Sequence, residues 1–471
     1  MRTSRVASTS LSSLAAALDS EVAVWPYARP KRSAAKAQRR IFWRRRLVVL
    51  ACLAAVVSGF GWLVSTPGSG ALGASSGELR PIHVPLPSLV PLVPATTRIP
   101  GAVASLPFPS TGQSAVYVRG VGLLGATPDE PSVPIASVTK VMTAVIVLRD
   151  HPLGDGSGPI FTMTAADHEE WIEAVANGES ALEVVAGERL TERQLLEALM
   201  IPSACNIADY LARWDAGSVT AFVRKMNAMA TSLGLRQTHY ADASGVNPGS
   251  RSTALDQAIL GSYAMTVPGM ISIEDHPGMR FPVEGLAPNY NPVVGEDGVI
   301  GLKSGFTDAA QICLVIAARR KVGDRIVLVV ASTLSQPSSL QGAGDIGLQL
   351  LDAATSDLGV HEILPAHAPV ASVVAGWTSK QPKLVIPVSM TVVGWPGLYV
   401  TTFVKASIPT KPGAGRGWGP GTKMADVEVS TPAGIEQVAP GRLNGFLPSA
   451  PLGWSPAATT SSTTVASSSQ A

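Results

Sequence analysis

Ser137-Val138-Thr139-Lys140 opens the apolar run VMTAVIVL, which covers residues 141–148. Pro134 just upstream is a typical signal for the start of a helix, so the run predicts a helix that begins near Ser137. Residues three apart on a helix share a face, and this places Ser137 beside Lys140. A neutral lysine near other cations can take the serine proton while the serine attacks a carbonyl carbon. By itself, the motif is more typical of a serine that caps the helix and a lysine at the surface.

A second segment, GVIGLKSGFTDAAQICLVIAARR over residues 298–320, favours the catalytic interpretation of Ser137 and Lys140. Its pattern predicts strands, and Lys303-Ser304-Gly305 then presents a cation, a hydroxyl and a residue without a side chain. Such a strand lets a peptide lie against its edge through backbone hydrogen bonds. Taken singly, the triplet fits an ordinary edge strand with a protective lysine just as well.

Four sequence blocks surround these motifs over roughly residues 105–350. They read IASVTKVMTA, ALMIPSACNIAD, ADASGVNPGSRSTALD and GLKSGFTDAAQICL. Ser203 lies 66 residues after Ser137 and 100 residues before Lys303. In order and spacing, the blocks resemble the D-alanyl-D-alanine carboxypeptidase family of low-molecular-mass penicillin-binding proteins, whose superfamily is marked by S-x-x-K, S-x-N and K-T-G. The resemblance implies an α/β (α+β) domain of the penicillin-binding and β-lactamase-like transpeptidase type.

This resemblance also implies roles around the reacting carbonyl. Ser137 would be the acylated nucleophile and Lys140 its general base. Ser203 would relay a proton towards the leaving amine. The backbone N–H groups of Ser137 and Phe306 would form an oxyanion hole, aimed where negative charge develops.

The substrate and its binding residues are likewise implied by the resemblance. Lys303 and Ser304 would orient the terminal carboxylate of a peptidoglycan stem peptide, which would lie along the strand at Gly305. The enzyme would remove the terminal D-alanine through an acyl-serine that water then hydrolyses. β-Lactam antibiotics would be covalent inhibitors, and the reaction would need no metal or organic cofactor.

The sequence departs from the family pattern at three places. The S-x-N block reads Ser203-Ala204-Cys205, and we expect the Cys205 thiol to face the cleft where the family has an amide. Asn206 is the second candidate substrate-binding residue in this block. In the alternative interpretation, Cys205 is a small buried hydrophobe and Asn206 takes the place of the amide after a local shift. Ser304 replaces the usual threonine and keeps the hydroxyl. Residues 331–350 contain no Lys or Arg, although the family usually brings a basic residue to the substrate carboxylate from that region.

Charge is distributed unevenly along the 471 residues. Residues 1–46 hold 11 Lys and Arg against two Asp and Glu, which leaves 25 against 32 in the remainder. An acidic main body disfavours binding of nucleic acid. Residues 47–65 then form 19 uncharged residues, long enough to cross a membrane with the basic flank in the cytoplasm. We favour an uncleaved anchor over a cleaved signal peptide, and the rest of the chain would lie outside the cell membrane.

Differences in composition and in hydrophobic pattern divide the remaining chain into a linker, two domains and a tail. Prolines over residues 66–100 predict an extended spacer, and mixed strand and helix patterns predict one domain over residues 101–360. Period-two patterns around Trp395-Pro396-Gly397 predict a small β-rich domain. The predicted organisation is a basic cytoplasmic segment (1–46), a transmembrane anchor (47–65), a linker (66–100), the carboxypeptidase-like domain (101–360), the β-rich domain (361–455) and a disordered Ser/Thr-rich tail (456–471).

Two other functions remain open on the sequence alone. A β-lactamase is the alternative within the enzyme class, although no clear motif supplies a deacylating glutamate. A non-catalytic wall-binding protein is the alternative from another class, and Cys205 and the missing basic residue support it. The three cysteines cannot form a disulfide framework, and no cluster has the spacing of zinc ligands.

Overall fold

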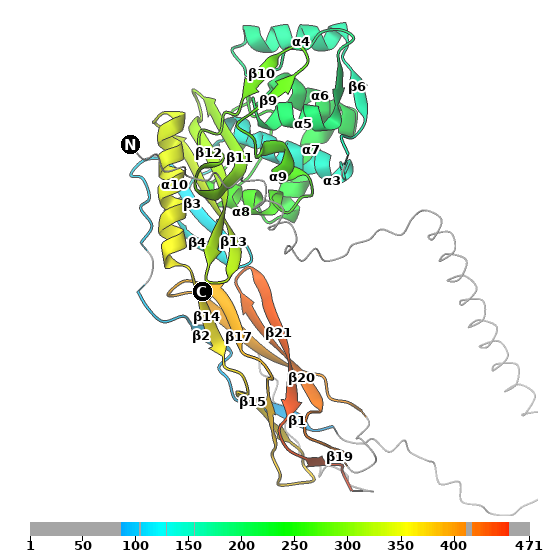
Figure 1. Ribbon diagram of the computed structural model, residues 1–471, viewed down its shortest axis with the longest axis vertical. Helices are drawn as coiled ribbons and strands as arrows, with labels where there is room; N and C mark the ends of the chain where they lie inside the picture. Colours follow the sequence, from blue (N-terminus) through cyan, green and yellow to red (C-terminus); the bar gives the residue numbers. More distant parts are fainter. Residues whose placement is uncertain (1–85, 103–104, 129, 155, 411–416, 452–471) are drawn as a thin grey trace, which may run out of the picture. The chain divides into compact units, whose positions relative to one another are not determined.

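The computed structural model (Figure 1) describes part of the chain, and the described residues belong to one compact unit. The predicted basic segment 1–46, the anchor 47–65 and the tail 456–471 lie outside the described residues. Within the described part, no helix is long and apolar enough to cross a membrane. The described residues are 86–102, 105–128, 130–154, 156–410 and 417–451.

A five-stranded antiparallel sheet forms the centre of the predicted carboxypeptidase-like domain, in the order β11-β12-β13-β3-β4. Alternate residues of each strand face opposite sides: Val315 packs in one hydrophobic cluster, whereas Leu314 and Ile316 pack in another. Both faces of the sheet are therefore covered, which explains the nearly continuous apolar runs in the sequence. The strands are β3 (Gln113–Val118), β4 (Gly122–Ala126), β11 (Val299–Thr307), β12 (Gln311–Val322) and β13 (Arg325–Gln336).

Helices α8 (Ala254–Ala264) and α10 (Leu340–Asp357) cover the two faces of this sheet (Figure 1). Each helix approaches the sheet at a glycine. A Cβ atom on Gly261 would lie 2.7 Å from Leu302 Cδ1, and one on Gly347 would lie 2.7 Å from Ile316 Cδ1. The small residues thus allow both helices to pack close to the sheet.

The remaining helices lie together on the β11 side of the sheet (Figure 1). Helices α4 and α5 begin with capping boxes, in which Thr164 and Thr191 accept from the third helical N–H while Asp167 and Gln194 bond back. The helix expected near Ser137 is present as α3. The helices of this group are α3 (Lys140–Asp150), α4 (Ala165–Ala176), α5 (Glu192–Met200), α6 (Cys205–Ala216), α7 (Val219–Ser232) and α9 (Met270–Glu274).

Short paired strands connect these helices and complete this part of the fold. All three pairs are antiparallel. They are β5 (Val133–Pro134) with β8 (Arg251–Ser252), β6 (Ile160–Thr162) with β7 (Arg189–Thr191), and β9 (Gly278–Phe281) with β10 (Gly285–Pro288).

A seven-stranded antiparallel sheet forms most of the β-rich part, in the order β1-β15-β16-β21-β20-β18-β2. The predicted turn at Trp395-Pro396-Gly397 is confirmed, since Leu398 N donates to Trp395 O at 3.0 Å. The strands of this part are β14 (Gly359–Leu364), β15 (Pro369–Val374), β16 (Lys383–Val385), β17 (Met390–Gly394), β18 (Tyr399–Ala406), β19 (Gly417–Trp418), β20 (Lys423–Thr431), β21 (Gly434–Leu443) and β22 (Leu447–Pro448).

The predicted linker 66–100 is wrong in its described part. Strands β1 (Ser88–Pro91) and β2 (Thr96–Arg98) pair with β15 and β18 and form the two edges of the seven-stranded sheet. Extended backbone rich in proline is close in conformation to a β-strand, and an edge strand tolerates residues without an N–H group. The same composition that predicted a spacer is therefore compatible with edge strands.

Packing continues across the predicted boundary near residue 360. One hydrophobic cluster contains Leu350 of α10, Val329 of the central sheet and Val427 of β20. The turn after β3 also contacts the β-rich part, where Thr431 Oγ1 donates to Gly120 O at 2.8 Å. The division into two domains therefore stays a prediction.

Candidate active site

Ser137 lies in one turn of 3-10 helix, η1 (Ala136–Thr139), that leads directly into α3. Lys140 Nζ donates a hydrogen bond of 2.9 Å to Ser137 Oγ, so the two side chains meet as the sequence predicts. Lys140 is fully buried, and neither helix uses Ser137 as its N-cap. The interpretation as a capping serine and a surface lysine is therefore wrong.

Lys140 Nζ has three hydrogen-bond acceptors. Besides Ser137 Oγ, these are Cys205 Sγ at 3.3 Å and the backbone oxygen of Ser244 at 2.8 Å. These three contacts come from three different segments of the chain and hold Nζ from three sides. The amine is consequently fixed next to the serine hydroxyl.

The loop that supplies Ser244 O is organised by Asp242. Its carboxylate accepts from Ser244 Oγ at 3.0 Å, Gly245 N at 2.8 Å and Asn247 N at 3.1 Å. Gly245 has φ of 87°, and a Cβ atom there would lie 1.8 Å from Ala136 O. Only glycine allows this loop to lie against η1. Sequence reasoning missed the role of Ser244, although the Asp-x-Ser-Gly turn within ADASGVNPGS is a signal for such a loop.

Cys205 is the first residue of α6 and faces the site, as expected. Its side chain is buried, and burial raises the pKa of the thiol, which favours the neutral form. A neutral thiol is a weak hydrogen-bonding group compared with an amide. Cys205 and Cys313 are both free thiols.

Asn206 does not enter the site. Its amide accepts from Leu182 N at 3.0 Å and donates to Leu182 O at 3.0 Å. Our prediction of Asn206 as a substrate-binding residue is therefore wrong in this structure, and so is the alternative in which it replaces Cys205. One residue along a helix turns the side chain by about 100°, and the local backbone does not compensate for this rotation.

Ser203 lies in the turn before α6 with φ of 65°, a conformation that side chains other than glycine rarely adopt. It is 3% exposed, and its Oγ atom has no hydrogen-bond partner among the described residues. Ser203 is one of the residues that line the cavity, although its Oγ atom itself is buried.

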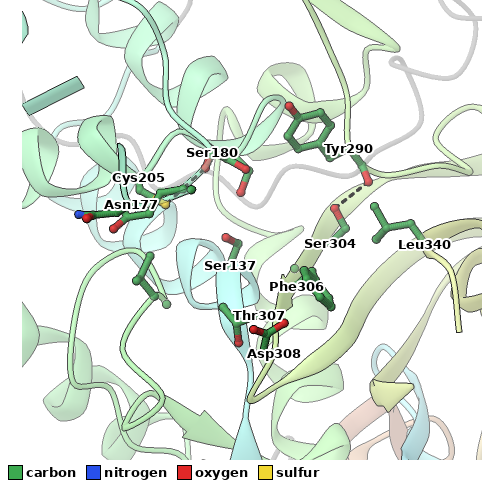
Figure 2. Close-up of a pocket in the computed structure, with 16 residues that line it drawn as sticks. Ser137, Asn177, Ser180, Cys205, Tyr290, Ser304, Phe306, Thr307, Asp308 and Leu340 are labelled. Atoms are coloured by element: carbon green, nitrogen blue, oxygen red, sulfur yellow. Dashed lines mark hydrogen bonds between the residues drawn. The ribbon is translucent and has the colours of Figure 1, made fainter. Parts of the chain in front are cut away.

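Lys303 and Ser304 lie on β11. Figure 2 shows Ser304 across the site from Cys205. Ser304 Oγ donates to Tyr290 O at 2.7 Å. Burial lowers the pKa of Lys303 to about 7, with Lys140 adding to the decrease and Glu274 opposing it. Lys303 is thus close to the balance between its charged and neutral forms at neutral pH.

Gly305 brings β11 against the nucleophile. A Cβ atom on Gly305 would lie 2.7 Å from Ser137 N and 3.1 Å from Val138 N. A side chain at this position would push the strand away from η1. Phe306, the next residue, is 57% exposed at the rim.

These residues surround a cavity of about 610 Å³. Figure 2 shows Ser137 between Cys205 and the β11 residues Ser304 and Phe306. Lys140 and Lys303 are buried next to this lining. Six predicted residues line the cavity: Ser137, Ser203, Cys205, Ser304, Gly305 and Phe306.

Sequence reasoning missed part of this lining. Residues 177–180 follow α4 and carry no motif that would have singled them out. Glu179 and Asp308 are charged lining residues, and none of the described lining residues is Lys or Arg. No group of three or more His, Cys, Asp or Glu side chains in the described part could hold a metal ion.

Comparison with protein families and solved structures now adds to this geometry. Residues 122–334 match the family described as D-alanyl-D-alanine carboxypeptidase. The structure is similar to that of penicillin binding protein 5 from Haemophilus influenzae, with a TM-score of 0.54, 19% identity, and coverage of 74% of this chain and 99% of that chain. That likeness shows the fold, and it confirms the expected mixed α and β architecture.

Curated relatives establish the family. DacB2, a D-alanyl-D-alanine carboxypeptidase of Mycobacterium tuberculosis, is 33% identical over 204 residues, covering 42% of this chain and 66% of its own length. The D-alanyl-D-alanine carboxypeptidase of Streptomyces sp. (strain K15) is 33% identical over 214 residues, which cover 42% of this chain and 72% of that protein. With its motifs gathered in one cavity, this chain belongs to the D-alanyl-D-alanine carboxypeptidase family of penicillin-binding serine peptidases.

Proposed function

We propose that the protein is a serine-type D-Ala-D-Ala carboxypeptidase that removes the terminal D-alanine of peptidoglycan stem peptides. The observation that carries this proposal is the hydrogen bond of 2.9 Å between Lys140 Nζ and Ser137 Oγ at the cavity. A serine next to a fixed amine is the arrangement that nucleophilic catalysis requires. Membership of the family supports this activity over a β-lactamase or a non-catalytic wall-binding protein.

In the acylation step, the neutral amine of Lys140 takes the hydroxyl proton while Ser137 Oγ attacks the carbonyl carbon of the penultimate residue. The oxyanion that forms lies against the backbone N–H groups of Ser137 and Phe306. Ser203 passes a proton to the departing nitrogen, and free D-alanine leaves. Water then hydrolyses the acyl-serine and regenerates the hydroxyl.

Lys303 and Ser304 bind the terminal carboxylate of the substrate in this proposal. The ammonium of Lys303 supplies the charge. Ser304 Oγ already donates to Tyr290 O, so its hydroxyl rotates away from that oxygen when it donates to the carboxylate. Gly305 leaves the strand edge free for the substrate backbone.

Cys205 supports turnover with reduced efficiency. Its sulfur still contacts Lys140 Nζ at 3.3 Å, so the position of the amine is kept without the family's amide. A thiol gives a weaker hydrogen bond to the substrate than an amide does. We therefore propose a slow carboxypeptidase rather than a silent one.

The charge step at residue 46 and the apolar run 47–65 support an N-terminal membrane anchor with the enzyme outside the cell membrane. Protease added to intact cells should then degrade residues 66–471. Full protection of this part would contradict that location.

Labelling with a fluorescent penicillin tests the enzymatic proposal. The full chain should form a covalent adduct and release D-alanine from a peptide that ends in D-Ala-D-Ala. Ser137→Ala should abolish both, whereas Ser232→Ala, at an exposed serine of α7, should change neither. Labelling of the Ser137→Ala variant at another residue would overturn the proposed nucleophile.

A further inference from the structure

Glu274, the last residue of α9, has a carboxyl group that the proposed reaction does not use. Its side chain is 1% exposed, and neither carboxyl oxygen has a hydrogen-bond partner among the described residues. A buried carboxyl group without a partner costs free energy. Because most buried polar groups in proteins are hydrogen-bonded, this exception needs an explanation.

Strand β11 is shaped to receive this carboxyl group. Gly301 has φ of +137°, and a Cβ atom there would lie 2.7 Å from Glu274 Cδ and 2.9 Å from Oε2. Any other residue at this position would displace the carboxyl group. Lys303 is two residues further along β11, so it lies on the same side of the strand as the group that faces Gly301.

Charge links Glu274 to Lys303. Burial raises the pKa of Glu274 well above its usual value, Lys303 opposes this increase and Asp275 adds to it. The charged and titratable groups that act on Lys303 come from three elements: Lys140 of α3, Cys205 of α6 and Glu274 of α9. Lys140 disfavours the ammonium form of Lys303, whereas a carboxylate at Glu274 favours it.

Helix α5 also packs against α9, and two of its charged groups have partners of their own. Arg193 and Glu197 pair with each other at 4.0 Å, and Arg193 also donates to Ser272 Oγ at 3.0 Å. Glu274 is therefore the buried carboxyl group whose charge acts on Lys303.

We propose that Glu274 is a positioning residue for the substrate's terminal carboxylate, acting through Lys303. The charge of Glu274 favours the ammonium form of Lys303 while the site is empty, so that a larger share of the lysine carries a positive charge when the substrate enters. Glu274 acts on Lys303 through its charge, and no bond between heavy atoms forms or breaks. This inference rests on the proposed function, in which Lys303 binds that carboxylate.

Glu274→Gln tests the inference, because it removes the charge and keeps the shape. The full chain is assayed for kcat/KM between pH 6 and 9 on a peptide that ends in D-Ala-D-Ala. A thioester of the same peptidyl group, with a leaving group that has no carboxylate, is the second substrate. Loss of the counter-charge should move the alkaline limb of kcat/KM for the peptide to lower pH by about one unit, which lowers kcat/KM about tenfold at pH values above that limb. The thioester should change less than about twofold, since it offers no carboxylate to Lys303.

Glu192→Gln is the matched control. Glu192 is also 1% exposed, its Oε1 atom has no hydrogen-bond partner among the described residues, and burial raises its pKa to about 7. It does not contribute to the charge at Lys303. The control should therefore leave both substrates and the alkaline limb unchanged.

Two results would overturn the inference: an unchanged alkaline limb, or an equal loss on the peptide and the thioester, which would indicate a merely structural role. If Glu274→Gln does not fold, Glu274→Asp takes its place, and it should move the limb to lower pH because the carboxylate retreats by one methylene group. An unchanged limb in that variant contradicts the inference. Failure of the proposed function is distinguishable, because the unmodified chain would then release no D-alanine, and the inference would fall with it.

Discussion

The two walls of the cavity hold their lysines in different ways. We call the side formed by η1, α3 and α6 the helical wall and the side formed by β11 the strand wall. On the helical wall, Lys140 donates hydrogen bonds to Ser137, Cys205 and Ser244. On the strand wall, the Lys303 side chain makes no hydrogen bond to the described residues. Burial disfavours its charged form, Lys140 adds to this effect, and Glu274 opposes it. Hydrogen bonds fix a position, whereas a charge balance responds to pH. We therefore expect changes on the helical wall to alter the rate and changes on the strand wall to alter its pH range.

Lys140→Met should have the largest effect, and it tests the helical wall. The variant keeps an unbranched chain in the buried site and removes the amine next to Ser137. Because a general base contributes about 10²- to 10⁴-fold, the rate of acylation by a fluorescent penicillin should fall by that factor at every pH. Stopped-flow fluorescence measures this rate.

Lys225→Met is the control for this variant. Lys225 lies on α7 and pairs with Asp150 and Asp215, away from the cavity. It should acylate at the rate of the unmodified chain. Acylation of the Lys140→Met variant within tenfold of that rate would show that another group takes the serine proton.

Cys205→Asn tests how much the hydrogen bond at position 205 of the helical wall contributes to catalysis. An amide at this position can accept from Lys140 and also donate to the substrate, which the buried thiol does weakly. A hydrogen bond to a group with developing charge is worth about 1.5–3 kcal/mol, so kcat/KM on a D-Ala-D-Ala peptide should rise by roughly 10- to 150-fold. Steady-state release of D-alanine measures the change.

Asn206→Ala is the neighbouring control. It removes the two hydrogen bonds to Leu182 and should lower the free energy of unfolding by about 1–3 kcal/mol, with little effect on kcat. If Asn206→Ala instead lowers kcat/KM and Cys205→Asn does not raise it, then Asn206, and not position 205, takes the place of the family's amide.

The motifs of the sequence located most of this site, and the reason is physical. Ser137, Lys140 and Lys303 carry side chains whose chemistry and spacing are specific. Nearly continuous apolar runs likewise predicted strands of the central sheet, because burial on both faces leaves a strong pattern. Those parts of the fold were predictable from local sequence.

Groups that act through backbone or through distant packing were not predictable in this way. The Ser244 carbonyl has no side-chain signature, and Glu274 is distinguished only by its burial against Gly301. Strands β1 and β2 exist because β15 and β18 offer them partners, which the proline-rich sequence does not reveal. Tertiary contacts decide each of these features.

The pH dependence of the unmodified enzyme gives the smallest expected effect and tests the strand wall. Lys303 has a pKa of about 7, and only its protonated form attracts the substrate carboxylate. The charge is present below this pKa and is lost as pH rises through it. We therefore expect kcat/KM, which reports the free enzyme, to fall about tenfold per pH unit above this value.

The profile of kcat separates this cause from others. In the enzyme–substrate complex, the bound carboxylate lies next to Lys303 and raises its pKa, because an opposite charge favours the ammonium form. The alkaline limb of kcat should therefore lie at higher pH than that of kcat/KM, and only for substrates with a terminal carboxylate. Coincident limbs for the two parameters would mean that another group causes the fall, and the strand wall would then hold its lysine as firmly as the helical wall does.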